Sequence, residues 1–162
     1  MPPGPEERPN TIPWPPLIYG AATAIALGLH VLAPIAWPAG LMGTLLLVPG
    51  LALMVAGLAL DLWAMRVFRQ HQTTVLPNRA ATALITDGPF RFSRNPIYTG
   101  NTMFVAGLGL VFGVAWLLLA AAVSALLTQK LAIEREERHL AARFGNGWSD
   151  YAARTPRWLF WR

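Results

Sequence analysis

Long apolar runs, each able to cross a lipid bilayer, constrain the fold of this chain more than any other feature. No Lys or Arg occurs between residues 9 and 65, and the run over 41–68 carries no charge before Asp61. A helix needs roughly 20 apolar residues to span the hydrocarbon core of a membrane. We therefore expect membrane helices over about 17–37 and 41–68, joined by a tight connection and packed together as an antiparallel hairpin.

The second half of the chain predicts another pair of helices. Residues 97–129 contain no charged side chain, and this stretch is too long for one ordinary span. Closely spaced glycines indicate a turn near 113–115. We expect helices over about 96–112 and 115–142, the second continuing beyond the membrane into water. The predicted fold class is all-α, a polytopic membrane bundle of about four transmembrane helices with a C-terminal helical tail.

Composition and charge agree with a membrane protein. Hydrophobic residues make up 54% of the chain and charged residues 13%, against roughly 25% charged residues in soluble domains. Apart from Arg8, every Lys and Arg lies within 66–94 or 130–162. With four spans these segments and both termini share one face, which the positive-inside rule identifies as cytoplasmic. We expect an inner-membrane protein with its polar clusters on that side, and no binding of nucleic acid.

The chain divides into three parts on this reading. Residues 1–16 are rich in proline and are expected to form an extended arm. Residues 17–68 form the first helical hairpin, and residues 69–162 contain the second hairpin, the polar segments and the tail. The chain has no cysteine, which excludes disulfides and thiolate chemistry. Its three histidines lack a ligand-spaced partner, so no metal site is expected.

A polar, turn-forming segment precedes the third expected helix. Pro96 suits the first position of a helix, because its ring presets φ and its missing N–H would have no partner there. Asn95 is then a plausible N-cap. Tyr98 lies in the first turn, and Gly100 permits close approach of a helix or a ligand. Either this segment holds a ligand, or it is an interfacial helix start in which Arg94 snorkels and Tyr98 joins an aromatic belt.

A second polar cluster follows the fourth apolar run. Glu134 and Arg138 are spaced to pair on a solvated helix face. Glu136 and Glu137 diverge by about 100° around the helix, so they cannot point the same way. Glu136 lies on the apolar side, beside Ile133, and is the better candidate for a buried or ligand-facing carboxylate.

Two further features stay open. Asp61 lies within an apolar span, where a carboxylate is functional by default unless it pairs with a loop arginine such as Arg66. The C-terminal tail mixes aromatic residues and arginines. It either lies along the lipid headgroups or closes over a site at the same membrane face.

The order of these motifs resembles that of the isoprenylcysteine carboxyl methyltransferase family and the related phospholipid methyltransferases. The resemblance covers about residues 66–157. The residues that carry it are Thr82-Ala83-Leu84-Ile85, Gly88-Pro89-Phe90, Arg94-Asn95-Pro96-Ile97-Tyr98-x-Gly100, and then Glu136-Glu137, Leu140, Phe144-Gly145 and Tyr151.

This resemblance implies an integral-membrane methyltransferase that uses S-adenosyl-L-methionine and methylates an O, S or N nucleophile of a lipophilic acceptor. It makes residues 69–162 the catalytic, cofactor-binding region, with the active site on the cytoplasmic side. It implies catalytic roles for Arg94, Tyr98 and Glu136, with Arg94 facing the reacting centre or a charged group of the acceptor. The residues it assigns to the cofactor are Thr82, Ala83, Leu84 and Ile85 in a strand-like stretch, Phe90, Asn95, Pro96, Ile97, Tyr98, Gly100, Glu136 and Glu137.

Some positions depart from the family pattern. Asn95 stands where histidine is usual, Phe90 stands where tyrosine is usual, and 130–133 lacks the additional substrate arginine of the prenylcysteine enzymes. These departures leave the acceptor open. The alternatives are a membrane reductase of the sterol-reductase type using NADPH, and a non-catalytic lipid-binding relative. Gly109 and Gly113 permit close helix contacts within one chain or between copies, so the oligomeric state is not assigned.

Overall fold

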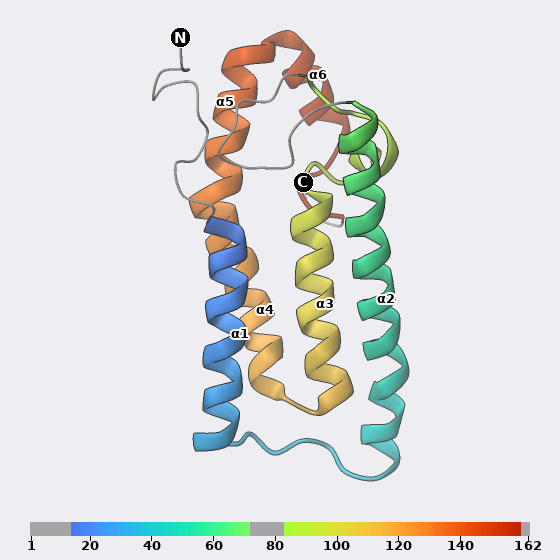
Figure 1. Cartoon of the computed structure of the whole chain (residues 1–162), viewed down its shortest axis with the longest axis vertical. Coiled ribbons are helices and arrows are strands. Elements are labelled where there is room, and N and C mark those ends of the chain that lie inside the picture. The colour runs from blue at the N-terminus through green and yellow to red at the C-terminus, as the bar shows by residue number, and fades with distance from the viewer. Residues whose placement is uncertain (1–13, 72–82, 160–162) are drawn as a thin grey trace.

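The computed structural model describes residues 14–71 and 83–159, and within these ranges the chain is an all-helical bundle without strands (Figure 1). This confirms the predicted fold class. The elements are α1 (Trp14–Leu32), α2 (Leu41–Gln70), the 3-10 turn η2 (Gly88–Arg91), α3 (Pro96–Phe112), α4 (Ala115–Thr128), the π-helical turn η3 (Gln129–Ile133), α5 (Glu134–Phe144) and α6 (Asn146–Arg154).

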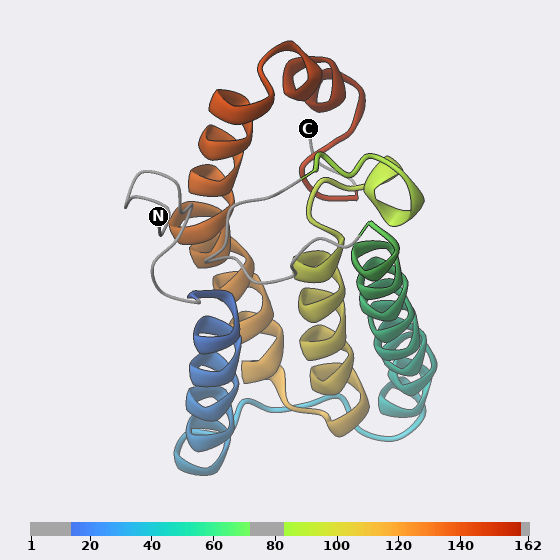
Figure 2. The ribbon, with the colours of Figure 1, turned by 45° about the horizontal axis from the view of Figure 1, so that its top comes forward.

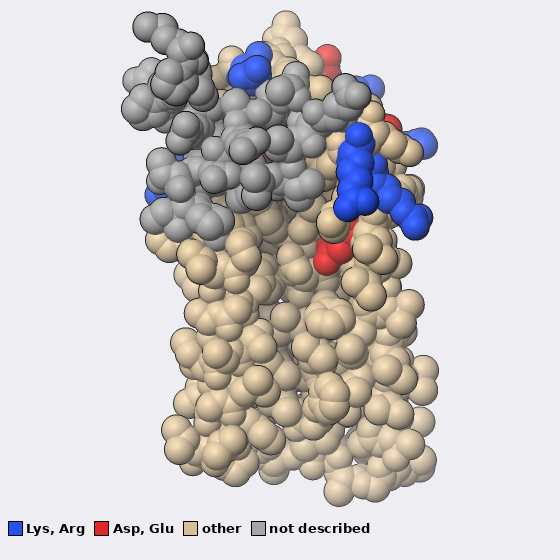
Figure 3. All heavy atoms as spheres, viewed as in Figure 1, with Lys and Arg blue, Asp and Glu red and all other residues tan. Residues whose placement is uncertain are grey.

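Three helices are long and apolar enough to cross a membrane. They are α1, α2 and the continuous run Ala115–Phe144. The fourth expected span, α3, is apolar but has only 17 residues. Figure 3 shows the charged side chains of the visible face gathered toward one end of the bundle, above a broad apolar surface. These features describe an integral membrane helix bundle, and its cytoplasmic orientation stays a prediction.

The order of packing differs from the expected hairpin. Helix α1 packs against α4, α4 packs against α3, and α3 packs against α2. Figures 1 and 2 show α1 and α2 at opposite sides of the bundle, with the second hairpin between them. The prediction that the first two helices pack on each other was therefore wrong. Helix α1 ends at Leu32, so residues 33–40 form a longer link than expected. Helix α2 packs on α3 instead of on α1.

Glycines make the α2–α3 contact close. A Cβ atom added to Gly57 of α2 would lie 2.6 Å from the carbonyl oxygen of Gly100 on α3. One added to Gly107 of α3 would lie 2.7 Å from the carbonyl oxygen of Gly50 on α2. Small residues at these positions let two helix backbones approach each other. The expected close approach at Gly100 therefore occurs, and the approaching group is a helix.

The turn between α3 and α4 lies where the glycines predicted it. Helix α3 ends at Gly113, which takes the left-handed conformation at φ +68° and donates its amide to the Gly109 carbonyl. A Cβ added to Gly109 would lie 3.2 Å from Leu117 of α4. The small residues at 109 and 113 thus serve contacts within one chain.

The last long helix is interrupted by a change of helical type. Residues Gln129–Ile133 form a π-helical turn between α4 and α5. The continuous helical run ends at Phe144, two residues beyond the expected end near residue 142. Gly145 follows at φ +50° and ψ −123°, which differs from the left-handed helical conformation of Gly113, and a further helix, α6, begins at Asn146. π-turns within helices often occur at functional sites.

Candidate functional site

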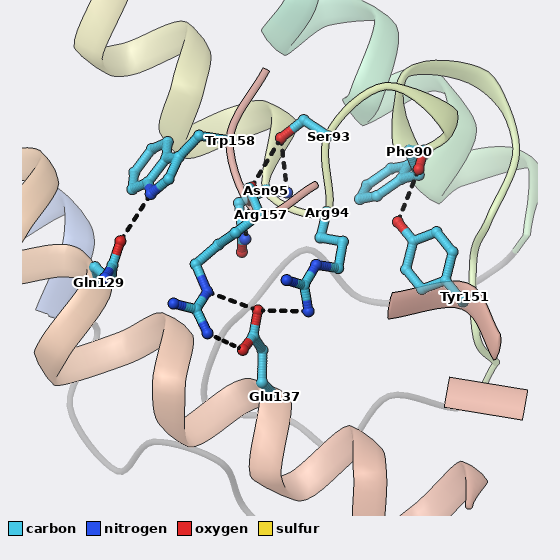
Figure 4. Close-up of polar contacts among 9 residues, drawn as sticks. All are labelled: Phe90, Ser93, Arg94, Asn95, Gln129, Glu137, Tyr151, Arg157 and Trp158. Carbon is cyan, nitrogen blue, oxygen red and sulfur yellow. Dashed lines mark hydrogen bonds and ion pairs between the residues drawn. The ribbon is translucent and has the colours of Figure 1, made fainter. Parts of the chain in front are cut away.

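Three parts of the chain meet at the charged end of the bundle. They are the loop before α3, helix α5 and the residues after α6 (Figure 4). Glu137 on α5 stands between two arginines. Arg94 Nη1 lies 3.0 Å from Glu137 Oε1, and Arg157 donates to both carboxylate oxygens, at 3.0 Å from Nε and 2.6 Å from Nη2. Bidentate pairs of this kind are among the stronger polar contacts in proteins.

The charged cluster is shielded from water. The side chains of Arg94, Glu137 and Arg157 are 12%, 15% and 28% exposed. Burial lowers the pKa of Arg94, and the Glu137 charge opposes that change. The hydrogen bonds from Arg157 to Glu137 raise the pKa of Arg157. Both arginines therefore remain cations, and Glu137 is the common counter-ion.

The neighbouring carboxylate has a different partner. Tyr98, in the first turn of α3, donates its hydroxyl to Glu136 Oε1 at 3.1 Å. Glu136 and Glu137 therefore face different groups, as their angular separation predicts. The structure brings Arg94, Tyr98 and Glu136, the three residues expected to carry the chemistry, to one end of the bundle.

A strap formed by residues 155–159 closes over this end. Of the two interpretations of the tail, the described part supports the one in which it covers the site. Besides the bonds from Arg157 to Glu137, the hydrogen bonds between the strap and the loop or helix around it include Arg94 N–H to Pro156 O (2.9 Å), Ser93 Oγ and Asn95 Nδ2 to Arg157 O (3.1 Å each), and Trp158 Nε1 to Gln129 Oε1 (2.8 Å).

Asn95 was predicted to cap α3, but its side chain does not do so. It precedes the helix, but its side chain makes no capping bond and instead donates to the Arg157 carbonyl. The Thr99 hydroxyl donates to the Asn95 carbonyl at 3.0 Å. The strap supplies a backbone acceptor that the local sequence does not contain, and Asn95 binds that acceptor.

A buried aromatic cluster packs the loop before α3 against α6. Ile85 and Phe90 pack with Trp148 and Tyr151 of α6, and Leu84 is partly buried against them. Tyr151 donates its hydroxyl to the Phe90 carbonyl at 2.8 Å. Burial raises the pKa of Tyr151, so this hydroxyl remains a donor at neutral pH.

The other residues assigned to a cofactor are distributed around this core. Thr82 lies outside the described residues. Ala83 begins an irregular segment, so the described part of the expected strand-like stretch is not a strand. Pro96 is buried, and Ile97 packs against the aromatic cluster. The Cα–H face of Gly100 points at α2, so Gly100 supports helix packing.

The open interpretations of two acidic residues are also resolved. Glu134 pairs with Lys130 at 2.7 Å rather than with Arg138. Asp61 does not pair with Arg66, and within the described residues its buried Oδ1 has no hydrogen-bond partner.

An apolar groove is lined by residues that neighbour the site in the chain, among them Trp158 next to Arg157 and Thr99 next to Tyr98. Its volume is about 390 Å³, within the range of about 300–1,000 Å³ typical of small-molecule sites. It lies where the strap meets the bundle. The lining residues are Leu53 of α2, Thr99, Thr102, Met103 and Ala106 of α3, Ala125 of α4, and Trp158 and Leu159 of the strap.

Arg157 and Trp158 belong to the aromatic, basic tail noted in the sequence, but neither was assigned a contact of its own, and the π-helical turn was not predicted. A local signal exists for the strap, because Pro156 stops α6 and places the next residues in non-helical backbone. The apolar pattern gave no signal for the π-turn. Its Gln129 side chain nevertheless receives the Trp158 indole N–H.

Comparison with known proteins identifies the family. A model of the phospholipid methyltransferase family matches residues 45–147. The chain belongs to this family. The matched residues include most of α2 and all of α3, α4 and α5, whereas α1 and the strap lie outside them.

Two curated relatives match half of the chain. The nickel-cobalt-cadmium resistance protein NccN of Alcaligenes xylosoxydans xylosoxydans is 35% identical over 81 residues, which are 50% of this chain and 38% of that protein. The cobalt-zinc-cadmium resistance protein CzcN of Cupriavidus metallidurans is 31% identical over 81 residues, 50% of this chain and 37% of that protein. The match thus spans less than two fifths of either relative. No solved structure matches the chain.

Proposed function

We propose that this protein is a membrane methyltransferase that uses S-adenosylmethionine and methylates an O, S or N nucleophile of a lipophilic acceptor. The observation that carries the proposal is one juxtaposition in a phospholipid methyltransferase family member. The Tyr98–Glu136 pair and the Arg94–Glu137–Arg157 cluster lie beside an apolar groove. Polar and apolar reactants can therefore meet at one end of the bundle.

The charges of the site fit this cofactor. S-adenosylmethionine carries a carboxylate, an ammonium group and a sulfonium. Arg94 Nε is buried and has no hydrogen-bond partner among the described residues, which leaves one cationic donor for a carboxylate. Glu136 suits the ammonium group, and the Tyr98 ring suits a nearby cation. When bound, the cofactor supplies a methyl group on a positively charged sulfur.

We assign distinct tasks to the two carboxylates. Glu136, which accepts a hydrogen bond from the neutral Tyr98 hydroxyl, takes part in binding the cofactor together with Tyr98. Glu137 already has two guanidinium partners, so it acts by holding Arg94 and the strap in place. Transfer between two bound reactants depends largely on how they are positioned and on exclusion of water. Leu84, Ile85, Phe90 and Ile97 pack in the aromatic cluster next to the loop that carries Arg94, and their task is to support that loop.

The groove suits the apolar part of the acceptor. Its lining comes from three helices and the strap, and it includes Trp158, one residue from Arg157. An acceptor whose chain lay in the groove would present its polar end to the charged cluster. This arrangement leaves the identity of the nucleophile open, as the departures at Asn95 and Phe90 do.

Calorimetric titration of the detergent-solubilised protein with S-adenosylhomocysteine tests the proposal. We expect Tyr98→Ala and Glu136→Ala each to weaken binding at least tenfold, about 1.4 kcal/mol. Glu134→Ala is the matched control, because Glu134 is on the same helix but pairs with Lys130, and its affinity should equal that of the wild type. Absence of binding at millimolar ligand in folded protein would refute the proposal. Preferential stabilisation by NADPH would favour a reductase instead.

A further inference from the structure

We infer that Tyr19, on helix α1, is a positioning residue for the Tyr98–Glu136 pair. The Tyr19 hydroxyl lies 3.1 Å from the Tyr98 carbonyl oxygen and 2.5 Å from Thr102 Oγ1. Helix α1 lies outside the residues that the family model matches. The functional meaning of this inference rests on the proposed function, because the pair it concerns is the proposed cofactor site.

The hydroxyl groups converge on the backbone of the residue that contacts Glu136. Thr102 donates to the Tyr98 carbonyl at 2.8 Å, and the single proton of the Tyr19 hydroxyl goes either to that carbonyl or to the Thr102 oxygen. In both arrangements Tyr19 joins α1 to the first turn of α3. The Tyr98 backbone carbonyl is thus held by Tyr19 and Thr102, and its side-chain hydroxyl is held by Glu136.

The position of Tyr19 is not explained by the packing of α1 alone. Helix α1 packs mainly against α4 through small apolar residues, including Ala22 and Ala26. Tyr19 is 7% exposed within this apolar contact. An unpaired hydroxyl there would cost free energy, whereas an apolar residue would pack without that cost. The Tyr19 hydroxyl reaches across to α3, where it contacts the Tyr98 carbonyl and the Thr102 hydroxyl.

Tyrosine NMR can test this link without any ligand. The chain has three tyrosines, so Tyr19→Phe leaves only Tyr98 and Tyr151. We would label tyrosine with ¹³C at the ring carbon that bears the hydroxyl, in micelles of the full chain, and assign the two signals with Tyr151→Phe. The Tyr98 signal should shift or broaden in Tyr19→Phe and in Thr102→Val. The Tyr151 signal should stay in place as an internal control.

A matched control and a binding measurement complete the test. Thr44→Val removes a hydroxyl that likewise bonds a carbonyl four residues earlier, on the far part of α2, and should leave Tyr98 unchanged. Affinity for S-adenosylhomocysteine should fall about fivefold in Tyr19→Phe, the effect of one hydrogen bond. Combining Tyr19→Phe with Glu136→Ala should give little further loss, because both act through one pair.

The outcomes separate this inference from the proposed function. An unchanged Tyr98 signal in folded Tyr19→Phe and Thr102→Val would overturn the positioning role, whatever the protein binds. If Tyr19→Phe does not fold, Tyr19→Leu decides the same question, because it also lacks the hydroxyl and leaves the direct bond from Thr102 to the Tyr98 carbonyl in place. A moved Tyr98 signal in a protein that does not bind S-adenosylhomocysteine would support the link between α1 and α3 and would refute the proposed cofactor.

Discussion

The α2–α3 interface is held together by close packing of two helix backbones, whereas the charged end of the bundle is held together by ion pairs between side chains. At the interface, glycines bring backbone against backbone, and Gly57 and Gly100 leave no room for a single added carbon. At the charged end, Glu137 and its two arginines join segments through side-chain ion pairs. The first kind of contact fixes helices in place. Ion pairs of the second kind can be exchanged for contacts with a charged ligand. A binding site is therefore expected at the charged end of the bundle.

Helix α3 belongs to both regions. Gly100 faces α2, and Tyr98, two residues earlier, reaches Glu136 on α5. The rigid interface therefore sets the position of the first turn of α3, and through it the position of Tyr98. Irregular backbone near a membrane survives where protein satisfies its hydrogen bonds, and the strap does this for the loop before α3.

Breaking the rigid region should have the largest effect. Gly57→Ala would place a carbon 2.6 Å from the Gly100 carbonyl oxygen, so the two helices must separate. We expect a loss of about 3 kcal/mol in the free energy of unfolding, at the upper end for overpacked sites. Denaturant unfolding in detergent measures it. Gly28→Ala is the matched control, because an added carbon there meets nothing described within 4 Å. Equal stability of the two variants would contradict the account of this interface.

Removing the counter-ion of the charged end should have a smaller effect. Glu137→Gln leaves Arg94 and Arg157 side by side without their shared carboxylate. Since the cluster is partly exposed, we expect a loss of about 2 kcal/mol, below the 3–5 kcal/mol typical of a fully buried pair. The same unfolding measurement applies. Glu134→Gln, which breaks the exposed pair with Lys130, should change stability little. Similar losses in both variants would show that Glu137 does not join the strap to α5.

The features that follow from local sequence were predictable. Pro96 and Gly113 mark the limits of α3, because each imposes its own backbone geometry wherever it stands. The meeting of Tyr98 and Glu136 followed from the order of the spans, which places the start of α3 and the end of the next long helix at the same end of the bundle. Both predictions needed only residues near each other in sequence or a count of crossings.

The features that depend on tertiary partners were not predictable. Apolar surface alone does not choose between neighbours, so α1 was expected on α2 and instead packs on α4. The side chain of Asn95 suits a helix cap, but the Arg157 carbonyl competes for it, and no local pattern shows that this acceptor is present. Local sequence rules thus correctly described Asn95 as a hydrogen-bonding residue, but the strap determines which group its side chain binds.

The smallest expected effect comes from a neutral hydrogen bond behind the charged end. Tyr151→Phe removes the donor to the Phe90 carbonyl and should cost about 1 kcal/mol at neutral pH. Burial raises the pKa of Tyr151, whereas an unfolded tyrosine ionises near pH 10. The stabilisation is therefore fully present below about pH 10 and is lost as the pH rises toward the folded pKa. Unfolding at a series of pH values from 7 to 11 should show the difference between wild type and Tyr151→Phe narrowing only above about pH 10. A difference that does not change with pH would mean that this hydroxyl is not held in its neutral form by the fold.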